Sequence, residues 1–272
     1  MRISSGFRIW LASAVIVIAA PAVAFDPTPE TDTPAKAFTF GYSAYQAGDI
    51  ATALDAIGYA AEQGHTPAQW LLGQMYATGD GVETDDARAF AIFAGIVDDH
   101  ANDRRRNNDD APFVADAFVA LGNYYRAGTV AGIDPEAALQ LYWHAATYFN
   151  DPAAQLYLAQ MFYRGETGVG DAGQAVRWAN LAAQSGSPPA QALLGYLLFQ
   201  GEGVARQPLL GLAFLHVARA GDGTADPEIR RMHEEAFAAA TETERRTAFE
   251  LANDWLDANA TPPLAPADAP PR

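Results

Sequence analysis

Apolar and polar positions along this chain follow an order that returns several times. The stretch YAAEQGHTPAQWLLGQMYATGDGV (59–82) contains the pattern Ala-Ala-x-x-Gly-(x)3-Ala-Gln-x-x-Leu-Gly-x-x-Tyr-x-x-Gly. The pattern recurs in AAQSGSPPAQALLGYLLFQGEGV (182–204) and, with two single-residue insertions, in AATYFNDPAAQLYLAQMFYRGETGV (145–169). FVALGNYYRAG (118–128) is a copy altered at its start, and FGYSAYQAGD (40–49) keeps only the end. The chain is therefore built of repeats.

The spacing of the copies predicts a stacked architecture. The leucine of the pattern is found at Leu72, Leu121, Leu158 and Leu194, at intervals of 49, 37 and 36 residues. The first interval contains a polar insert of thirteen residues, DHANDRRRNNDDA (99–111), and without it the interval is also 36. A constant period in this range indicates units that bury their apolar faces against their neighbours.

Each unit is expected to form two helices. The first follows a turn rich in Gly, Asp or Pro, and it ends at a glycine suited to the left-handed position after a helix. These glycines are Gly79, Gly128, Gly165 and Gly201. The second begins near Asp85, Asp134, Asp171 or Pro208 and continues with apolar residues at helical spacing. The sequence thus predicts an all-α protein, a right-handed α-solenoid of helix pairs over residues 35–260.

The first 24 residues are predicted to be a signal peptide. Arg2 and Arg8 precede a short apolar run, Ile9–Ala20, and small residues lead up to Ala24. This order is typical of a secretory signal, with cleavage after Ala24. An uncleaved membrane anchor is the alternative, but the run is shorter than the roughly 20 residues that a span needs.

The segments around the solenoid differ in composition. Residues 25–34 are rich in Pro, Thr and Asp, and residues 261–272 are rich in Pro and Ala, so both are expected to be disordered. The helix start Asp226-Pro227-Glu228 and the capping-box pattern Thr241-Glu242-Thr243-Glu244 predict two helices within 226–260. These helices would cap the solenoid with a polar outer face.

Net charge and cysteine content restrict the classes of partner and the chemistry that are expected. The 272 residues carry a formal net charge of −16 and include no cysteine. An acidic surface without a basic stripe repels phosphate, which argues against nucleic acid and against direct membrane binding. A chain without cysteine forms no disulfide and uses no thiolate chemistry. Together with the signal peptide, this predicts a periplasmic protein that packing alone holds together.

No pattern in the sequence indicates catalysis, a metal site or a cofactor. GETGVG (165–170) has the glycines of a phosphate loop but is followed by Asp171 where Lys is needed. DGVETDD (80–86) lacks the alternating ligands and central glycine of a calcium loop, and its acids are expected to cap helices. The histidines are His65, His100, His144, His216 and His233, and none lies three or four residues from another. We expect no enzyme, no cofactor and no metal.

The first helices of the repeats are expected to line an inner groove. Polar and aromatic residues follow each Leu-Gly or Leu-Ala of the pattern and recur one turn later, and with Trp70 they would form a stripe that binds a protein segment. The predicted stripe consists of Trp70, Gln74, Asn123, Arg126, Gln160, Tyr163, Tyr196 and Gln200. The alternative is an ordinary exposed helix face.

The pattern Ala-Gln-x-x-Leu-Gly-x-x-Tyr-x-x-Gly-x-Gly-Val resembles the Sel1-like repeat, a relative of the tetratricopeptide repeat. Further stretches resemble the periplasmic repressors of exopolysaccharide synthesis of alphaproteobacteria. These are AFDPT at the predicted cleavage site, YAAEQGHT, MYATGDGV, LGNYY after the insert, GLAFLHVA (211–218) and TETERRTAFELAND (241–254).

This resemblance implies a regulator rather than an enzyme. Such a repressor would bind the periplasmic domain of a membrane sensor histidine kinase and restrain its two-component system, and so exopolysaccharide and envelope gene expression. Periplasmic proteases would relieve the restraint. A general envelope scaffold that binds other periplasmic proteins is the alternative, because fold does not fix function. Cysteine-rich Sel1-like proteins described as binding or cleaving penicillins are disfavoured by the absence of cysteine.

Overall fold

A computed structural model describes residues 33–102, 109–168, 170–220 and 226–258. The described residues form twelve α-helices and one π-helical turn, and none of them lies in a strand. The helices are α1 (Pro34–Gln46), α2 (Ile50–Glu62), α3 (Thr66–Thr78), α4 (Asp86–His100), α5 (Ala111–Ala127), α6 (Pro135–His144), α7 (Pro152–Arg164), α8 (Ala172–Ala183), α9 (Pro188–Gln200), α10 (Pro208–Ala220), α11 (Pro227–Ala239) and α12 (Glu242–Asp257). The predicted all-α class is confirmed.

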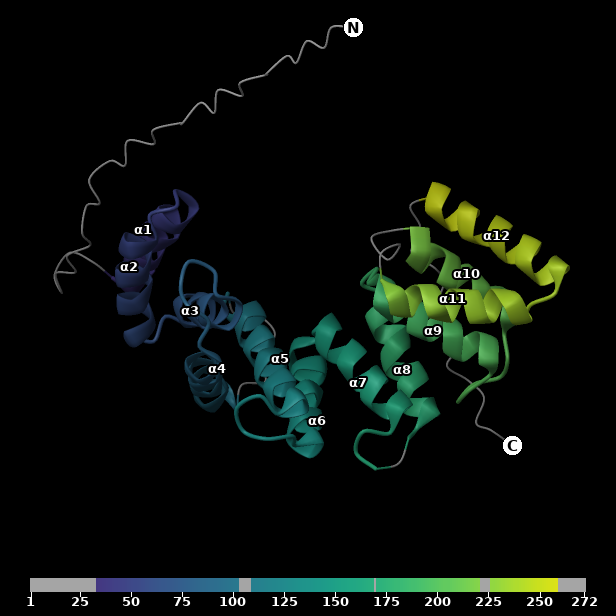
Figure 1. Ribbon diagram of the computed structural model, residues 1–272, viewed down its shortest axis with the longest axis horizontal. Coiled ribbons are helices and arrows are strands. Elements are labelled where there is room, and N and C mark those ends of the chain that lie inside the picture. Colours follow the sequence, from purple (N-terminus) through teal and green to yellow (C-terminus); the bar gives the residue numbers. More distant parts are fainter. Residues whose placement is uncertain (1–32, 103–108, 169, 221–225, 259–272) are drawn as a thin grey trace, which may run out of the picture.

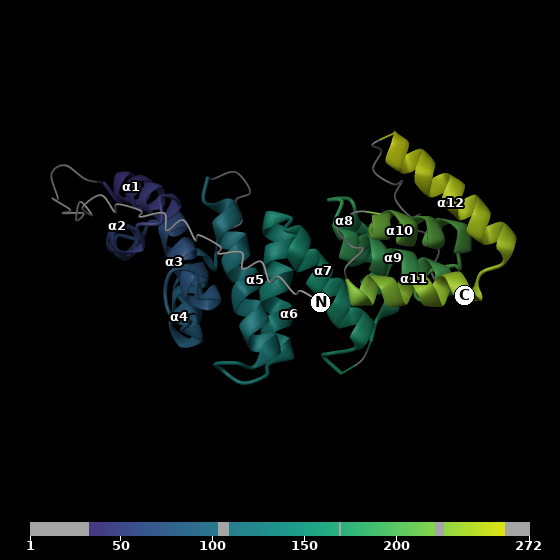
Figure 2. The same ribbon diagram turned by 45° about the horizontal axis from the view of Figure 1, so that its top comes forward.

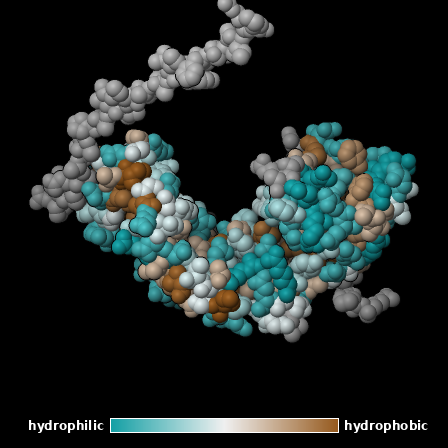
Figure 3. All heavy atoms as spheres, viewed as in Figure 1, coloured by the Kyte–Doolittle hydropathy of each residue, from teal (hydrophilic) through white to brown (hydrophobic). Residues whose placement is uncertain are grey.

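Consecutive helices pack as antiparallel pairs, and the pairs stack into a right-handed solenoid. The chain curves into a crescent whose two arms are α1–α3 and α10–α12 (Figures 1 and 2). Helices α3 and α5 lie on the inner side of the curve, and their partners α4 and α6 lie on the outer side (Figure 1). The space-filling view shows the hollow between the two arms (Figure 3).

The helix boundaries follow from residues that cap them. Aspartates at the starts of α2, α4, α6, α7 and α8 accept a hydrogen bond from a backbone N–H of the first turn, which satisfies a donor that has no partner within the helix. The predicted glycines end α3, α5, α7 and α9 with left-handed φ values, between 65° at Gly165 and 78° at Gly201. A glycine adopts this conformation without the steric cost that a Cβ atom brings.

Glycine in the Leu-Gly position lets the two helices of a pair approach closely. A Cβ atom on Gly122 would lie 2.6 Å from Cε1 of Tyr142, and one on Gly73 would lie 2.8 Å from Cε1 of Phe93. Both rings are fully buried. The apolar core runs along the solenoid as three neighbouring clusters, as expected when each unit packs only against the next.

A single extra residue in the copy of the pattern at 145–169 is accommodated by a π-helical turn. The turn η1 (Ala145–Phe149) continues α6 and ends at Asn150, whose φ is 57°. Gly64 and Gly186 occupy the corresponding place in the other copies, with φ values of 78° and 80°. Asparagine is one of the few side chains that tolerate this left-handed conformation.

The two C-terminal helices begin where the sequence predicts. Asp226 caps α11, and Thr241 with Glu244 forms the predicted capping box of α12. Phe237 and Phe249 on these helices are 38% and 53% exposed. The polar outer face of this pair stays a prediction. No helix among the described residues is both long and apolar enough to cross a membrane.

Several predicted segments lie partly or wholly outside the described residues. These are the signal peptide 1–24, most of the lead-in 25–34, the tail 261–272 and the centre of the insert 99–111. The edges of the insert are helical, since α4 extends to His100 and α5 begins at Ala111.

Candidate functional site

The residues of the predicted stripe lie on four helices of the same kind in successive pairs. Trp70 and Gln74 are on α3, Asn123 and Arg126 on α5, Gln160 and Tyr163 on α7, and Tyr196 and Gln200 on α9. The structure brings some of these residues into contact across repeats, and it buries others.

Arg126 and Gln160 meet at the centre of the crescent, together with a residue that the sequence pattern did not single out. Arg126 donates from Nε to Oε2 of Glu166 (2.7 Å), from Nη2 to Oε1 of Glu166 (2.5 Å) and from Nη1 to Oε1 of Gln160 (3.3 Å). The side chains of Arg126 and Glu166 are only 18% and 22% exposed. Arg126 is therefore held within the chain, and its main contribution is to join α5 to the end of α7.

Asn123 is exposed but also held in place. Its Oδ1 accepts a hydrogen bond of 2.7 Å from the hydroxyl of Tyr142, a fully buried side chain on α6. Burial raises the pKa of Tyr142 because it disfavours the phenolate. The phenol thus stays a donor, and the amide of Asn123 has a fixed orientation at the surface.

The two tyrosines of the stripe lie side by side, but α11 covers one of them. The rings of Tyr163 and Tyr196 are 6.5 Å apart and nearly perpendicular. Tyr196 is only 8% exposed, its hydroxyl donates to Oε2 of Glu235 (2.9 Å), and the guanidinium of Arg231 lies 5.8 Å from its ring. Tyr196 is thus buried beneath α11, although the sequence analysis placed it on an exposed stripe.

The stripe is consequently divided into two parts. Helix α11 packs on α9 and α10, and its first turn lines a small cavity of about 140 Å³ with Gln160 and Tyr163. The part on α3, α5 and the start of α7 has no helix packed over it among the described residues. Gln200, beyond Tyr196, is exposed.

At the N-terminal part of the stripe, Trp70 and Gln74 are half-buried. The ring of Trp70 packs edge-on against Phe113 at 5.4 Å, and its Nε1 has no hydrogen-bond acceptor in the structure. Amide side chains, an indole and an arginine–glutamate pair on neighbouring helices suit recognition of a protein segment, which offers both apolar and polar groups.

Within the described ranges, no three His, Asp or Glu side chains lie close enough together to hold a metal ion.

A pair of histidines was missed by the sequence analysis. His216 of α10 and His233 of α11 lie with Nδ1 and Nε2 at 3.3 Å. Seventeen positions separate them, so no helical spacing could indicate the contact.

Comparison with known proteins identifies the repeats. The model of the Sel1 repeat matches residues 66–94, 152–187 and 188–221. These ranges correspond to α3 with most of α4, α7 with α8, and α9 with α10. Two solved structures share the fold. A Sel1 repeat protein from Oxalobacter formigenes is 25% identical with a TM-score of 0.61, covering 84% of this chain and 90% of that chain. The antigen c5321 of uropathogenic Escherichia coli, which displays an SLR fold, is 23% identical with a TM-score of 0.68, covering 84% of this chain and 46% of that chain.

Two relatives match over nearly their whole length. The exopolysaccharide production negative regulator of Rhizobium leguminosarum bv. viciae is 37% identical over 247 residues, which cover 89% of this chain and 90% of the relative. The protein of the same name from Rhizobium meliloti (strain 1021) is 37% identical over 243 residues, covering 87% and 88%. The alignments cover about nine-tenths of this chain and are not confined to the repeats, so this chain, an α-solenoid of Sel1 repeats, belongs to the family of exopolysaccharide production negative regulators (ExoR).

Proposed function

We propose that this protein is a periplasmic regulator that binds the periplasmic domain of a membrane sensor histidine kinase and holds its two-component system inactive. Exopolysaccharide and envelope genes are then expressed when periplasmic proteases remove the protein. The observation that carries this proposal is the 37% identity to two negative regulators of exopolysaccharide production over about nine-tenths of the chain. The signal-like residues 1–24 support export to the periplasm.

The fold supports a role in binding rather than in turnover. A solenoid presents a long inner surface on rigid helices, and such surfaces bind extended or helical segments of other proteins. The uncovered part of the inner surface, around Gln74 and Asn123, is the proposed contact. Helix α11 shows what can dock on such a surface, since its Arg231 and Glu235 reach the ring and the hydroxyl of Tyr196 on α9.

Binding to the isolated periplasmic domain of the kinase tests the contact. Gln74→Arg adds a long charged side chain to the uncovered part, and we expect it to weaken binding about tenfold, as substitution of a central interface residue does. Gln140→Arg places the same side chain at an exposed site on α6, the outer helix, and we expect it to leave the affinity unchanged. Equal affinities for both variants would move the contact away from the inner surface.

Deletion of the gene tests the regulatory role itself. We expect exopolysaccharide output to rise, and to fall again when the wild-type gene is restored. Unchanged output after deletion would contradict the role of a negative regulator. If output rises but the protein does not bind the kinase domain, the regulator acts through a different partner.

A further inference from the structure

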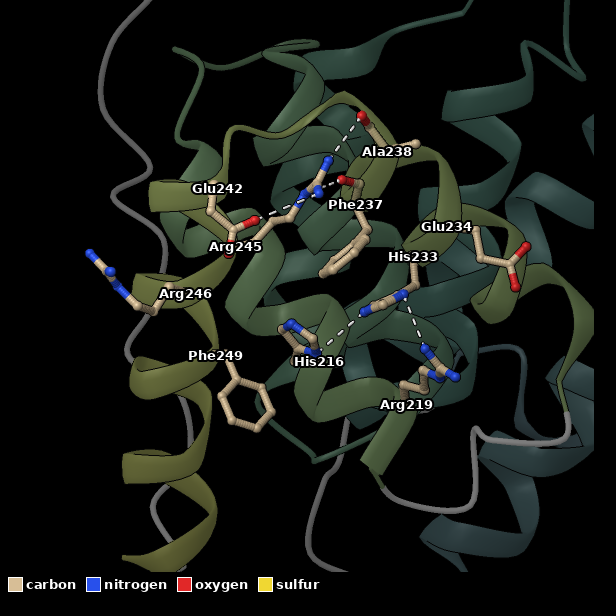
Figure 4. Close-up of a pocket in the computed structure, with 10 residues that line it drawn as sticks. All are labelled: His216, Arg219, His233, Glu234, Phe237, Ala238, Glu242, Arg245, Arg246 and Phe249. Atoms are coloured by element: carbon tan, nitrogen blue, oxygen red, sulfur yellow. Dashed lines mark hydrogen bonds and ion pairs between the residues drawn. The ribbon is translucent and has the colours of Figure 1, made fainter.

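A pocket of about 630 Å³ opens between the last three helices. It is lined by His216 and Arg219 of α10, by His233 and Phe237 of α11, and by Arg246 and Phe249 of α12, among others (Figure 4). Pockets of this size that are mostly apolar with a few convergent polar groups are typical of sites for small organic molecules.

The pocket exists because α11 and α12 diverge after a tight turn. Helix α12 packs along α10, where the ring of Trp255 lies 5.5 Å from that of Phe214, whereas α11 leans on α9. Arg245 fixes the narrow end, since its Nε and Nη2 donate to the carbonyl oxygens of Phe237 (2.8 Å) and Ala238 (3.3 Å). Such bonds satisfy carbonyls at the end of α11 that have no helical partner. The packing of α11 and α12 and the contacts of Arg245 thus keep the pocket open.

Aromatic rings form the apolar part of the wall. The rings of Phe237 and Phe249 lie 6.4 Å and 5.5 Å from the ring of His216, and they are 38% and 53% exposed. Figure 4 shows His216 between His233 and Phe249. Exposed phenylalanines that converge on one cavity offer apolar area to a ligand.

The hydrogen bonds along the histidine pair assign their protons. Nη1 of Arg219 lies 3.4 Å from Nδ1 of His233, and because a guanidinium can only donate, this Nδ1 is the acceptor. His233 then carries its proton on Nε2 and donates it to Nδ1 of His216 at 3.3 Å. His216 consequently carries its own proton on Nε2, which is buried and has no acceptor in the structure. A buried donor without an acceptor is costly, and a ligand oxygen would relieve that cost.

Burial and neighbouring positive charge disfavour the protonated form of both histidines. Burial lowers the pKa of His216, with a further contribution from Arg219. Burial, then His216 and Arg219, lower the pKa of His233 to about 4. Both rings are therefore uncharged near neutral pH, so the assigned protons hold there.

The charged groups around the pocket are mostly cationic. The lining includes three arginines (Arg219, Arg245 and Arg246) and two glutamates (Glu234 and Glu242), in a chain whose net charge is −16. Nη1 of Arg245 lies 3.9 Å from Oε2 of Glu242, whereas Arg246 is exposed and forms no ion pair with any described residue. The pocket is thus locally favourable for a negative charge on an otherwise acidic protein.

We propose that this pocket binds a small organic monocarboxylate. The carboxylate accepts the Nε2 proton of His216 in the field of Arg219, Arg245 and Arg246, and the apolar body of the ligand lies against Phe237 and Phe249. This site is separate from the proposed kinase contact and does not depend on it.

Octanoate is a suitable probe for the full-length protein. Octanol has the same apolar body without the charge, and octyltrimethylammonium has the opposite charge. We expect octanoate to bind at least tenfold more tightly than either, and to shift the Nε2 resonance of His216 in a sample with nitrogen-15 histidine. Equal affinity for octanol, or an unchanged His216 resonance, would overturn the proposal.

Variants separate the pocket from the rest of the surface. His216→Phe removes the donor but keeps an aromatic ring, and Phe249→Ala removes an exposed part of the wall, so that at least the second should fold normally. We expect each to weaken octanoate binding at least fivefold, while Arg230→Gln, on α11 outside the pocket lining, leaves it unchanged. Unchanged binding in both pocket variants would overturn the proposal. A dimer that octanoate dissociates would do so as well, since it would assign the pocket to a second copy of the chain.

Discussion

Arg126 on α5 and Glu166 in the turn after α7 form a two-point ion pair. The pair joins the α5–α6 unit, which the Sel1 model does not match, to the α7–α8 unit, which it does match. Nε and Nη2 lie 2.7 Å and 2.5 Å from the two carboxylate oxygens, and both side chains are largely buried. A guanidinium and a carboxylate match in this geometry, which makes the pair stronger than a single hydrogen bond. The contact joins the C-terminal end of α5 to the turn after α7.

Arg126→Met should therefore destabilise the protein. It leaves Glu166 partly buried without its main partner, and we expect the free energy of unfolding to fall by about 1–3 kcal/mol. Arg164→Met removes a half-exposed arginine 3.8 Å from the same carboxylate, and the expected loss is below about 0.5 kcal/mol. Urea denaturation of both variants measures the difference. Equal losses would show that the buried pair contributes no more than a surface contact.

Gly122→Ala tests the close approach of α5 and α6. The new Cβ would lie 2.6 Å from Cε1 of the fully buried Tyr142, so that either the ring or the helix must move. We expect a loss of about 1–3 kcal/mol in the free energy of unfolding. The matched control is Gly58→Ala on α2, where a Cβ meets no atom within 4 Å. Alanine favours a helix over glycine, so the control should gain up to about 1 kcal/mol.

Asp116 on α5 gives a prediction for the pH dependence of stability. Burial, and then the charge of Asp151, raise the pKa of Asp116 to about 6, above the roughly 3.9 of an unfolded aspartate. The folded state thus holds this proton more tightly, and above pH 6 the ionised carboxylate destabilises the fold. Asp116→Asn removes that cost, so the variant should be more stable than the wild type at pH 7.5, by about 1 kcal/mol after allowance for solvent screening.

The advantage of Asp116→Asn should shrink as the pH falls through 6 towards 4, because the wild-type carboxyl becomes protonated. Thermal unfolding of both proteins at several pH values checks this trend. Asp98→Asn, at an exposed position on α4, gives the baseline for the loss of one negative charge. A difference between Asp116→Asn and wild type that does not change with pH would show that Asp116 titrates alike in both states.

The capping box of α12 gives a local test. The hydroxyl oxygen of Thr241 accepts from the N–H of Glu244 (3.2 Å), and Oε2 of Glu244 accepts from the N–H of Thr241 (2.7 Å). Thr241→Ala should cost about 1 kcal/mol of stability. Thr243→Ala, an exposed position in the same turn, should cost less than half of that. If the two substitutions have the same effect in urea denaturation, the box does not hold the start of α12.

The sequence alone predicted the repeats, the helix pairs and most helix ends. These features depend on residues close together in the chain. The side chain of Asp151 reaches the first turn of its own helix, and Gly79, with a left-handed φ, ends α3 by donating its N–H to the carbonyl of Met75. The Leu-Gly spacing likewise predicted close helix packing, since each pair is formed by neighbours in the sequence. The one-residue insertion before Gln155 was also visible, although its form, a π-helical turn ending at Asn150, was not.

Only the tertiary structure decided which helix faces are covered by other helices and which stay exposed. Tyr196 has the same place in its repeat as Gln74, yet it is buried, because α11 docks on α9 through contacts of Arg231 and Glu235 that lie 35 and 39 positions away. The divergence of α11 from α12, which opens a pocket beside His216, likewise depends on how each helix packs against α9 and α10. Such contacts are set by the summed shapes of distant side chains, and no local pattern encodes them.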